Sequence, residues 1–100
     1  MAKRNKHRGS SFDKFLREQG MYEEVQAAAV KRAVAEAIED GMREVGLSKQ
    51  AMAKLMRTSR SQLDRVLDPG YTAVQLDSVV RAAAAVGQEL RISFKKTVRT

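Results

Sequence analysis

The sequence predicts a mainly α-helical protein of about five helices, including a helix-turn-helix, with one C-terminal β-strand paired across a dimer. Apolar residues recur at three- and four-residue steps through most of the chain, which is the spacing of one helical face. Alanine is abundant, whereas the chain has three Phe, two Tyr and no Trp, and this composition favours closely packed helices over aromatic-rich strands. A period of two is found at the C-terminal end, in LRISFKKTV.

The chain divides into a short arm and one domain. Residues 1–9 are polar and basic without periodicity, so we expect a flexible basic arm there. A chain of 100 residues is one domain by length. Residues 10–100 are therefore predicted to form a single helix-turn-helix domain with the C-terminal strand.

Residue types that favour helix ends mark the predicted helices. Serine or threonine stands at four of the starts, and twice a glutamine three residues later completes a capping-box pattern, Ser59 with Gln62 and Thr72 with Gln75. Glycine stands at three of the ends. The predicted helices begin at Ser10, Tyr22, Ser48, Ser59 and Thr72, and they end near Gly20, Gly46, Met56, Leu67 and Gly87.

Residues 48–67, SKQAMAKLMRTSRSQLDRVL, contain two of these helices separated by a tight turn. The second helix has one apolar face, and its polar side chains lie on the opposite face. Small Ala53 lets the first helix cross the second closely. The pair can then present the second helix as a rigid rod to the DNA major groove, which is about one helix wide. The apolar face is formed by Leu63, Val66 and Leu67, the polar side chains opposite it are Ser61, Asp64 and Arg65, and Arg60 stands at the exposed N-terminal turn.

The positive charge is concentrated in the half of the chain that contains this pair. The net charge is +7, and residues 46–100 hold ten basic and four acidic side chains. Residues 9–45 hold five basic and eight acidic side chains. A basic surface of this kind favours a polyanionic partner, most often nucleic acid.

The stretch SKQAMAKLMRTSRSQLDRVLD resembles the helix-turn-helix of the phage-repressor (Xre) family. Ala53 matches the small position of the first helix, TSRS the entry to the recognition helix, and Leu63 its buried position. The similarity continues through YTAVQLDSVVRAAAAVG, and the chain as a whole is similar to small HigA-like antitoxins over roughly residues 22–94.

This resemblance implies roles for individual side chains. Base edges would be read from the recognition helix, and phosphates would be contacted mainly from the first helix and the caps. The implied base-reading residues are Arg60, Ser61, Gln62 and Arg65. The implied phosphate-contacting residues are Ser48, Lys49, Gln50, Lys54 and Ser59. One position departs from the family pattern, because Arg57 stands in the turn where that family usually has glycine, and a left-handed backbone there costs a non-Gly residue ~1 kcal/mol.

Several other classes of protein do not fit the sequence. The chain has no cysteine, which excludes disulfides and thiolate metal sites and suits a reducing cytoplasm. Its single histidine, His7, lies in the basic arm, and we find no Gly-rich phosphate loop or metal-ligand spacing. No apolar run reaches the ~18–20 residues needed to cross a bilayer. We therefore expect a cytoplasmic protein that is not an enzyme and has neither cofactor, metal nor membrane partner.

The expected function is sequence-specific repression of transcription through double-stranded DNA. On family resemblance alone, the protein would be the antitoxin of a type II toxin–antitoxin pair that represses its own operon, with a cognate toxin as a further partner. Two alternatives stay open. One is a phage- or plasmid-type repressor without a toxin, and the other is a protein-interaction module whose helices mask a partner.

The predicted strand also implies an assembly. A lone strand leaves its backbone groups unpaired and its apolar face, Leu90, Ile92 and Phe94, half exposed. The simplest partner is the same strand of a second copy, antiparallel across a two-fold axis. Such a homodimer would place two recognition helices about 34 Å apart, or a multiple of this, and require a palindromic operator. Pairing with a toxin's sheet, or folding back along its own helices, would be the competing outcomes.

Overall fold

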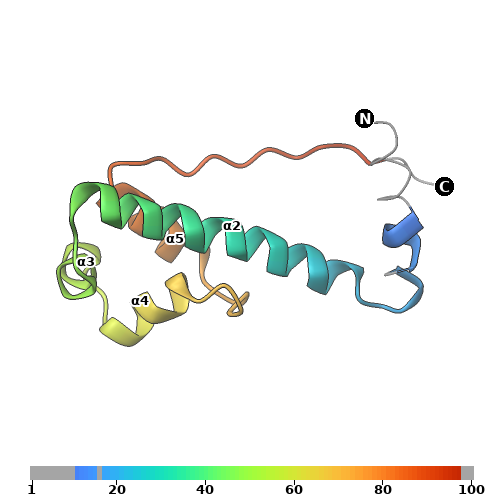
Figure 1. The fold of residues 1–100 in the computed structure, drawn as a ribbon, viewed down its shortest axis with the longest axis horizontal. Helices are drawn as coiled ribbons and strands as arrows, with labels where there is room; N and C mark the ends of the chain where they lie inside the picture. Colours follow the sequence, from blue (N-terminus) through green and yellow to red (C-terminus); the bar gives the residue numbers. More distant parts are fainter. Residues whose placement is uncertain (1–10, 16, 98–100) are drawn as a thin grey trace.

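The computed structural model describes residues 11–15 and 17–97, and it confirms a mainly α-helical protein. A short helical stretch at residues 11–15 and 17–18 comes first, and the predicted basic arm, residues 1–9, lies outside the described residues. Figure 1 shows the elements in order along the chain. The helices that follow are α2 (Tyr22–Val45), α3 (Lys49–Met56), α4 (Arg60–Leu67) and α5 (Leu76–Ala85).

Helix α2 determines the long dimension of the molecule. It has 24 residues, which corresponds to about 36 Å at 1.5 Å per residue. Glu23 and Glu24 lie in its first turn, where their negative charges interact favourably with the positive end of the helix dipole. Gly46 adopts a left-handed conformation, so its N–H and that of Leu47 reach back to the carbonyls of Arg43 and Met42. The predicted end of this helix at Gly46 is confirmed.

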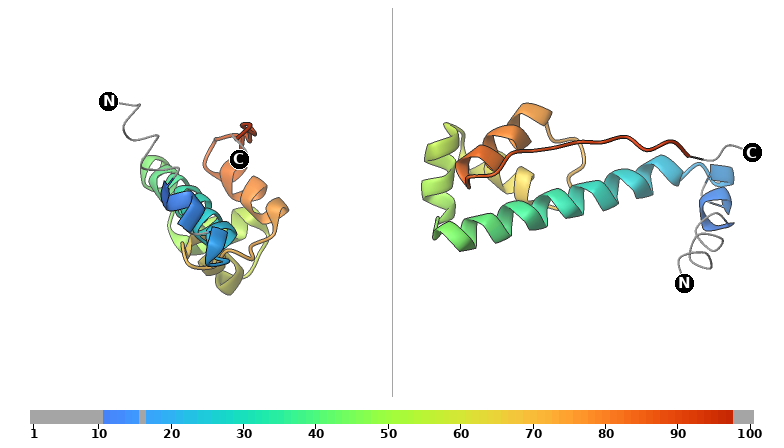
Figure 2. Two further views of the ribbon diagram at one scale, coloured as in Figure 1. Left: turned by 90° about the vertical axis from the view of Figure 1, so that its right-hand side faces the viewer. Right: turned by 90° about the horizontal axis from the view of Figure 1, so that it is seen from above.

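The three shorter helices gather around the C-terminal half of α2, as Figure 2 shows from two sides. Each contributes one apolar face to a single core. Met52, Leu63 and Val66 are its largest fully buried side chains, so the predicted apolar face of the second short helix is confirmed. The core cluster consists of Ile38, Met42, Met52, Ala53, Met56, Leu63, Val66, Leu67, Ala82 and Val86.

Gly41 permits a close approach between α2 and the end of α5. A Cβ atom at this position would lie 2.7 Å from Cγ2 and 2.9 Å from Cβ of Val86. Both distances are shorter than carbon atoms tolerate, and Val86 is itself buried. In the middle of a helix glycine lowers stability, so its presence here is explained by packing.

The last helix begins later than predicted. The Thr72 and Gln75 pattern predicts a start at Thr72, but α5 starts at Leu76 with Gln75 at its N-cap and without a side-chain cap bond. Residues 72–75 are outside the helix, and within them Val74 packs against the core. Val74 is partly buried there, and it contacts the core from outside the helix. The predicted end is correct, since Gly87 is left-handed and α5 stops just before it.

The C-terminal residues 88–97 are extended and do not form a strand in the part of the chain that the structure describes. They run back alongside α2 toward its N-terminal end, as both figures show. Leu90 is half-buried, whereas Ile92 is 60% and Phe94 is 97% exposed. The predicted strand is therefore not confirmed, because a strand needs a hydrogen-bonded neighbour and one chain offers none here. Of the outcomes considered, a single chain adopts the one in which the segment lies along its own helices.

Candidate nucleic-acid interface

The short helices α3 and α4 both begin at a serine whose side chain caps the helix. Ser48 Oγ accepts a hydrogen bond from the Ala51 N–H, and Ser59 Oγ accepts one from the Gln62 N–H, each at 3.1 Å. Such caps contribute about 1 kcal/mol each and determine where a short helix starts. The predicted starts at Ser48 and Ser59 are confirmed to the residue.

The turn between α3 and α4 keeps a left-handed residue even though the chain has no glycine there. Arg57 has φ 56° and ψ 48°, and it is the only non-glycine residue with positive φ among those described. Its N–H bonds to the Lys54 carbonyl, and the Thr58 N–H bonds to the Ala53 carbonyl. Arg57 therefore adopts the left-handed conformation that glycine usually adopts in this turn, and it bears the energetic cost expected for a non-glycine residue.

The four residues predicted to read bases all lie on α4 and are all exposed. They are Arg60, Ser61, Gln62 and Arg65. Within this group, Arg65 Nη1 donates to Gln62 Oε1 at 3.4 Å, and the Ser61 hydroxyl lies 3.2 Å from that of Ser59. These contacts are weak and open to solvent, so a ligand can replace them at little cost.

The five residues predicted to contact phosphates are exposed as well. They are Ser48, Lys49, Gln50, Lys54 and Ser59. Lys49 is tied to α4, because Asp64 lies 3.9 Å from Lys49 Nζ and 3.7 Å from Arg60 Nε. Exposed pairs of this kind contribute about 0–1 kcal/mol, so both cations remain available to an anion. The structure thus joins the first turn of α3 to the exposed face of α4.

A residue that the sequence analysis did not single out, Lys31 of α2, contacts the end of α4. Its Nζ donates to the carbonyls of Arg65 at 2.9 Å and Asp68 at 2.5 Å, and the residue is only 4% exposed. Burial lowers the pKa of the Lys31 amine, and the nearby Asp68 carboxylate partly opposes this shift. The available signal was its position, since Lys31 shares a helical face with Ala35, Ile38 and Met42.

Tyr71 is the second neighbour of α4 that sequence reasoning missed. The guanidinium carbon of Arg65 lies 5.6 Å from the centre of the Tyr71 ring, which is within the range of a cation–π contact. The Tyr71 N–H bonds to the Asp68 carbonyl at 3.1 Å, and the Gly70 N–H bonds to the Asp68 carboxylate at 2.9 Å. The turn formed by residues 68–71, DPGY, therefore places an aromatic ring beside a predicted base-reading side chain.

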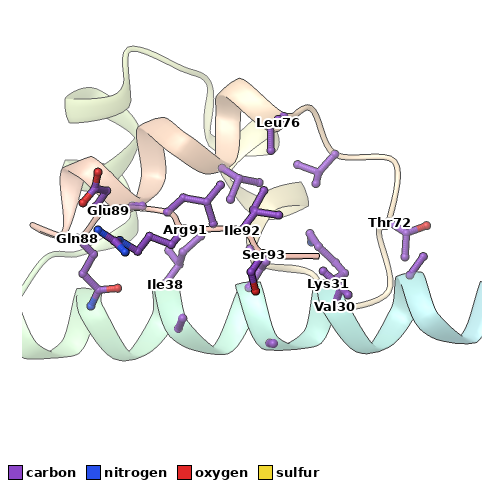
Figure 3. Close-up of a pocket in the computed structure, with 18 residues that line it drawn as sticks. Val30, Lys31, Ile38, Thr72, Leu76, Gln88, Glu89, Arg91, Ile92 and Ser93 are labelled. Carbon is purple, nitrogen blue, oxygen red and sulfur yellow. The ribbon is translucent and has the colours of Figure 1, made fainter. Parts of the chain in front are cut away.

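Away from α3, an open apolar groove of about 740 Å³ lies between α2, the start of α5 and the C-terminal segment (Figure 3). Val30, Leu76 and Ile92 line it from these three parts of the chain, and all three are more than half exposed. The Lys31 side chain forms part of the same wall. The groove is lined mainly by apolar side chains and is open to solvent.

The described part of the chain has neither a candidate metal site nor a membrane-spanning helix. No group of three or more His, Asp or Glu side chains there could hold a metal ion. None of the helices in residues 11–15 and 17–97 combines the length and apolar character needed to cross a bilayer. Comparison with known proteins gives no match to any family model, curated protein or solved structure.

Proposed function

We propose that the protein is a sequence-specific DNA-binding repressor that reads a palindromic operator with α4. The observation that carries this proposal is the pair α3 and α4, two capped helices of eight residues on one core, with every implied base-reading side chain exposed on the second. A helix of eight residues is about 12 Å long and about 10–12 Å wide with its side chains, which fits a major groove about 12 Å wide. The basic balance of residues 46–100 supports a polyanionic partner.

The two helices have different tasks in this proposal. Arg60 and Arg65 contact base edges, because a guanidinium can donate two hydrogen bonds to one guanine. Lys49 and Lys54 contact phosphates, because an ammonium provides charge without reading sequence. Asp64 pairs only weakly with Lys49 and Arg60, so a phosphate can replace it beside Lys49 and a base edge can replace it beside Arg60.

The experiment begins with selection of operator DNA from a random pool and then compares variants on operator and scrambled DNA at several salt concentrations. Arg65→Ala should lose ~1–3 kcal/mol on the operator and relax the preference at one base step. Lys54→Ala should weaken both DNAs about equally and flatten the salt dependence. Glu36→Ala, an exposed change on α2, is the control. The assignment of the two helices would be contradicted if Arg65→Ala weakened affinity for operator and scrambled DNA equally while Lys54→Ala weakened affinity for the operator alone.

The proposal includes a homodimer and, as an antitoxin, a cognate toxin. The homodimer rests on the exposed apolar residues of the C-terminal segment and on the groove beneath it. The toxin partner rests on the resemblance to small HigA-like antitoxins alone. In the dimer, residues 88–97 of two copies pair antiparallel and cover Ile92 and Phe94, which spaces the two α4 helices for a palindrome. Truncation after Gly87 should yield a monomer by light scattering that binds only half-sites. A truncated protein that remains dimeric on a full palindrome would refute this arrangement.

A protein-interaction module is the second candidate, and the almost fully exposed Phe94 specifically favours it. The two candidates differ at the recognition helix. If Arg65→Ala leaves the biological activity unchanged while Phe94→Ala abolishes it, the interaction module is correct. A small basic RNase-like protein encoded beside this gene would favour the antitoxin over a phage- or plasmid-type repressor.

A further inference from the structure

Helix α4 ends differently from the other three helices with defined bounds. A left-handed residue stands just beyond α2, α3 and α5, namely Gly46, Arg57 and Gly87. Helix α4 instead has Asp68 as its C-cap, and this residue has an extended backbone, with φ −87° and ψ 111°, and is followed by a proline. Its one cap bond, from the Asp68 N–H to the Arg65 carbonyl, is long at 3.4 Å. The local sequence therefore supplies a weak end to this helix.

Lys31 supplies the missing donor from a different helix. Its Nζ bonds to the Arg65 carbonyl in the last turn of α4 and to the Asp68 carbonyl just beyond it. These two acceptors carry the partial negative charge of a helix C-terminus, which favours a cation. Because the residue is buried, the contact is shielded from water and constrains the angle between α2 and α4.

The same two carbonyls belong to the part of α4 that holds Arg65 in place. The Asp68 carbonyl accepts a second hydrogen bond, from the Tyr71 N–H, and the Tyr71 ring lies beside the Arg65 guanidinium. Lys31, Asp68 and Tyr71 thus form a continuous path to the side chain of Arg65. Without the Nζ contact, the Tyr71 N–H would be the one remaining donor to the Asp68 carbonyl among the described residues.

We propose that Lys31 is a positioning residue that acts as the C-cap of α4 from α2 and thereby orients Arg65 for reading bases. This inference rests on the proposed function for its DNA consequence. The cap itself is a property of the free protein. One measurement tests the effect of Lys31 on DNA recognition, and the other tests the cap in the free protein.

The first measurement is operator discrimination by Lys31→Met, which keeps an unbranched stem against the groove and removes the donor and the charge. The ratio of operator to scrambled affinity should fall about tenfold, as expected when one bidentate base contact is misplaced. Arg32→Met, the neighbouring exposed position on α2, removes the same charge and should leave the ratio unchanged. If both variants lose affinity equally on operator and scrambled DNA, Lys31 contributes only charge and the proposal is wrong.

The second measurement needs neither DNA nor a folded variant. In the wild-type protein, nuclear magnetic resonance should show Lys31 Nζ protons that exchange slowly with water and lie close to protons of residues 65–71. Rapid exchange without such contacts would overturn the proposal even if the protein binds DNA. Conversely, the Nζ protons could be protected in a protein that selects no DNA sequence. In that case the cap would be correct and the proposed function would be wrong.

Discussion

Replacing Gly41 by alanine should destabilise the protein, although alanine is the better helix former. In the interior of an exposed helix the change would add about 1 kcal/mol to the free energy of unfolding. Here the new Cβ would lie 2.7 Å and 2.9 Å from two atoms of the buried Val86. Overpacking of this kind costs about 1–3 kcal/mol. Because Val86 is 4% exposed and has little room to move, we expect the upper part of that range and a net loss of about 1–2 kcal/mol.

Urea denaturation followed by far-ultraviolet circular dichroism measures this difference. Val86→Ala removes the methyl group responsible for the shorter contact, so the double variant should lose less than the sum of the two single variants, by about 1 kcal/mol. Glu39→Ala, exposed on the same helix, is the control for an alanine that meets no neighbour. A Gly41→Ala protein that is more stable than wild type, with additive energies in the cycle, would refute the packing argument.

Three further changes test other parts of the structure. Arg57→Gly should raise the free energy of unfolding by about 1 kcal/mol, because glycine adopts the left-handed turn without strain; no gain in urea denaturation would mean that the turn is not left-handed. Leu63→Ala should cost about 2–5 kcal/mol because the side chain is fully buried, whereas Leu55→Ala, at a residue 59% exposed, should stay within about 0.5 kcal/mol; equal losses would contradict the core. The lowered pKa of Lys31 means that above this pKa the folded chain binds fewer protons than the unfolded chain. The free energy of unfolding of wild type relative to Lys31→Met should therefore rise as pH increases toward 10.5, the ordinary lysine value, and a falling difference would show that the cation is stabilised in the fold.

Much of the helical architecture could be predicted from local signals. Ser48 and Ser59 determine the starts of α3 and α4, and Gly46 and Gly87 determine the ends of α2 and α5, since caps and left-handed residues act within one helical turn. The exposed face of α4 followed from helical periodicity alone. The same kind of signal failed at Thr72, where the chain stays outside the helix despite a capping-box pattern and Val74 contacts the core.

Apolar residues recur at three- and four-residue steps along α2, but burial follows this stripe only in part. The stripe consists of Tyr22, Val25, Ala29, Val34, Ile38, Met42 and Val45. Ile38 and Met42 are buried as the periodicity predicts, but Val25, Ala29 and Val45 on the same stripe are exposed. The three short helices gather around the C-terminal half of α2, which leaves Val25 and Ala29 uncovered, and Val45 is the last residue of the helix. No local pattern shows how far the short helices extend along α2. The exposed half adjoins the groove, which is where we expect a second copy or partner.

The sequence by itself determined the class of fold, most helix ends and the set of polar side chains on α4, because these depend on residues within a few positions of one another. Only the tertiary structure decided the role of Lys31, which bonds to carbonyls 34 and 37 residues away, and the reason for Gly41, which is set by Val86. In the tertiary structure, residues 88–97 also have no strand to pair with. Period-two alternation specifies two faces of an extended chain, but a strand forms only when a second backbone supplies the hydrogen bonds.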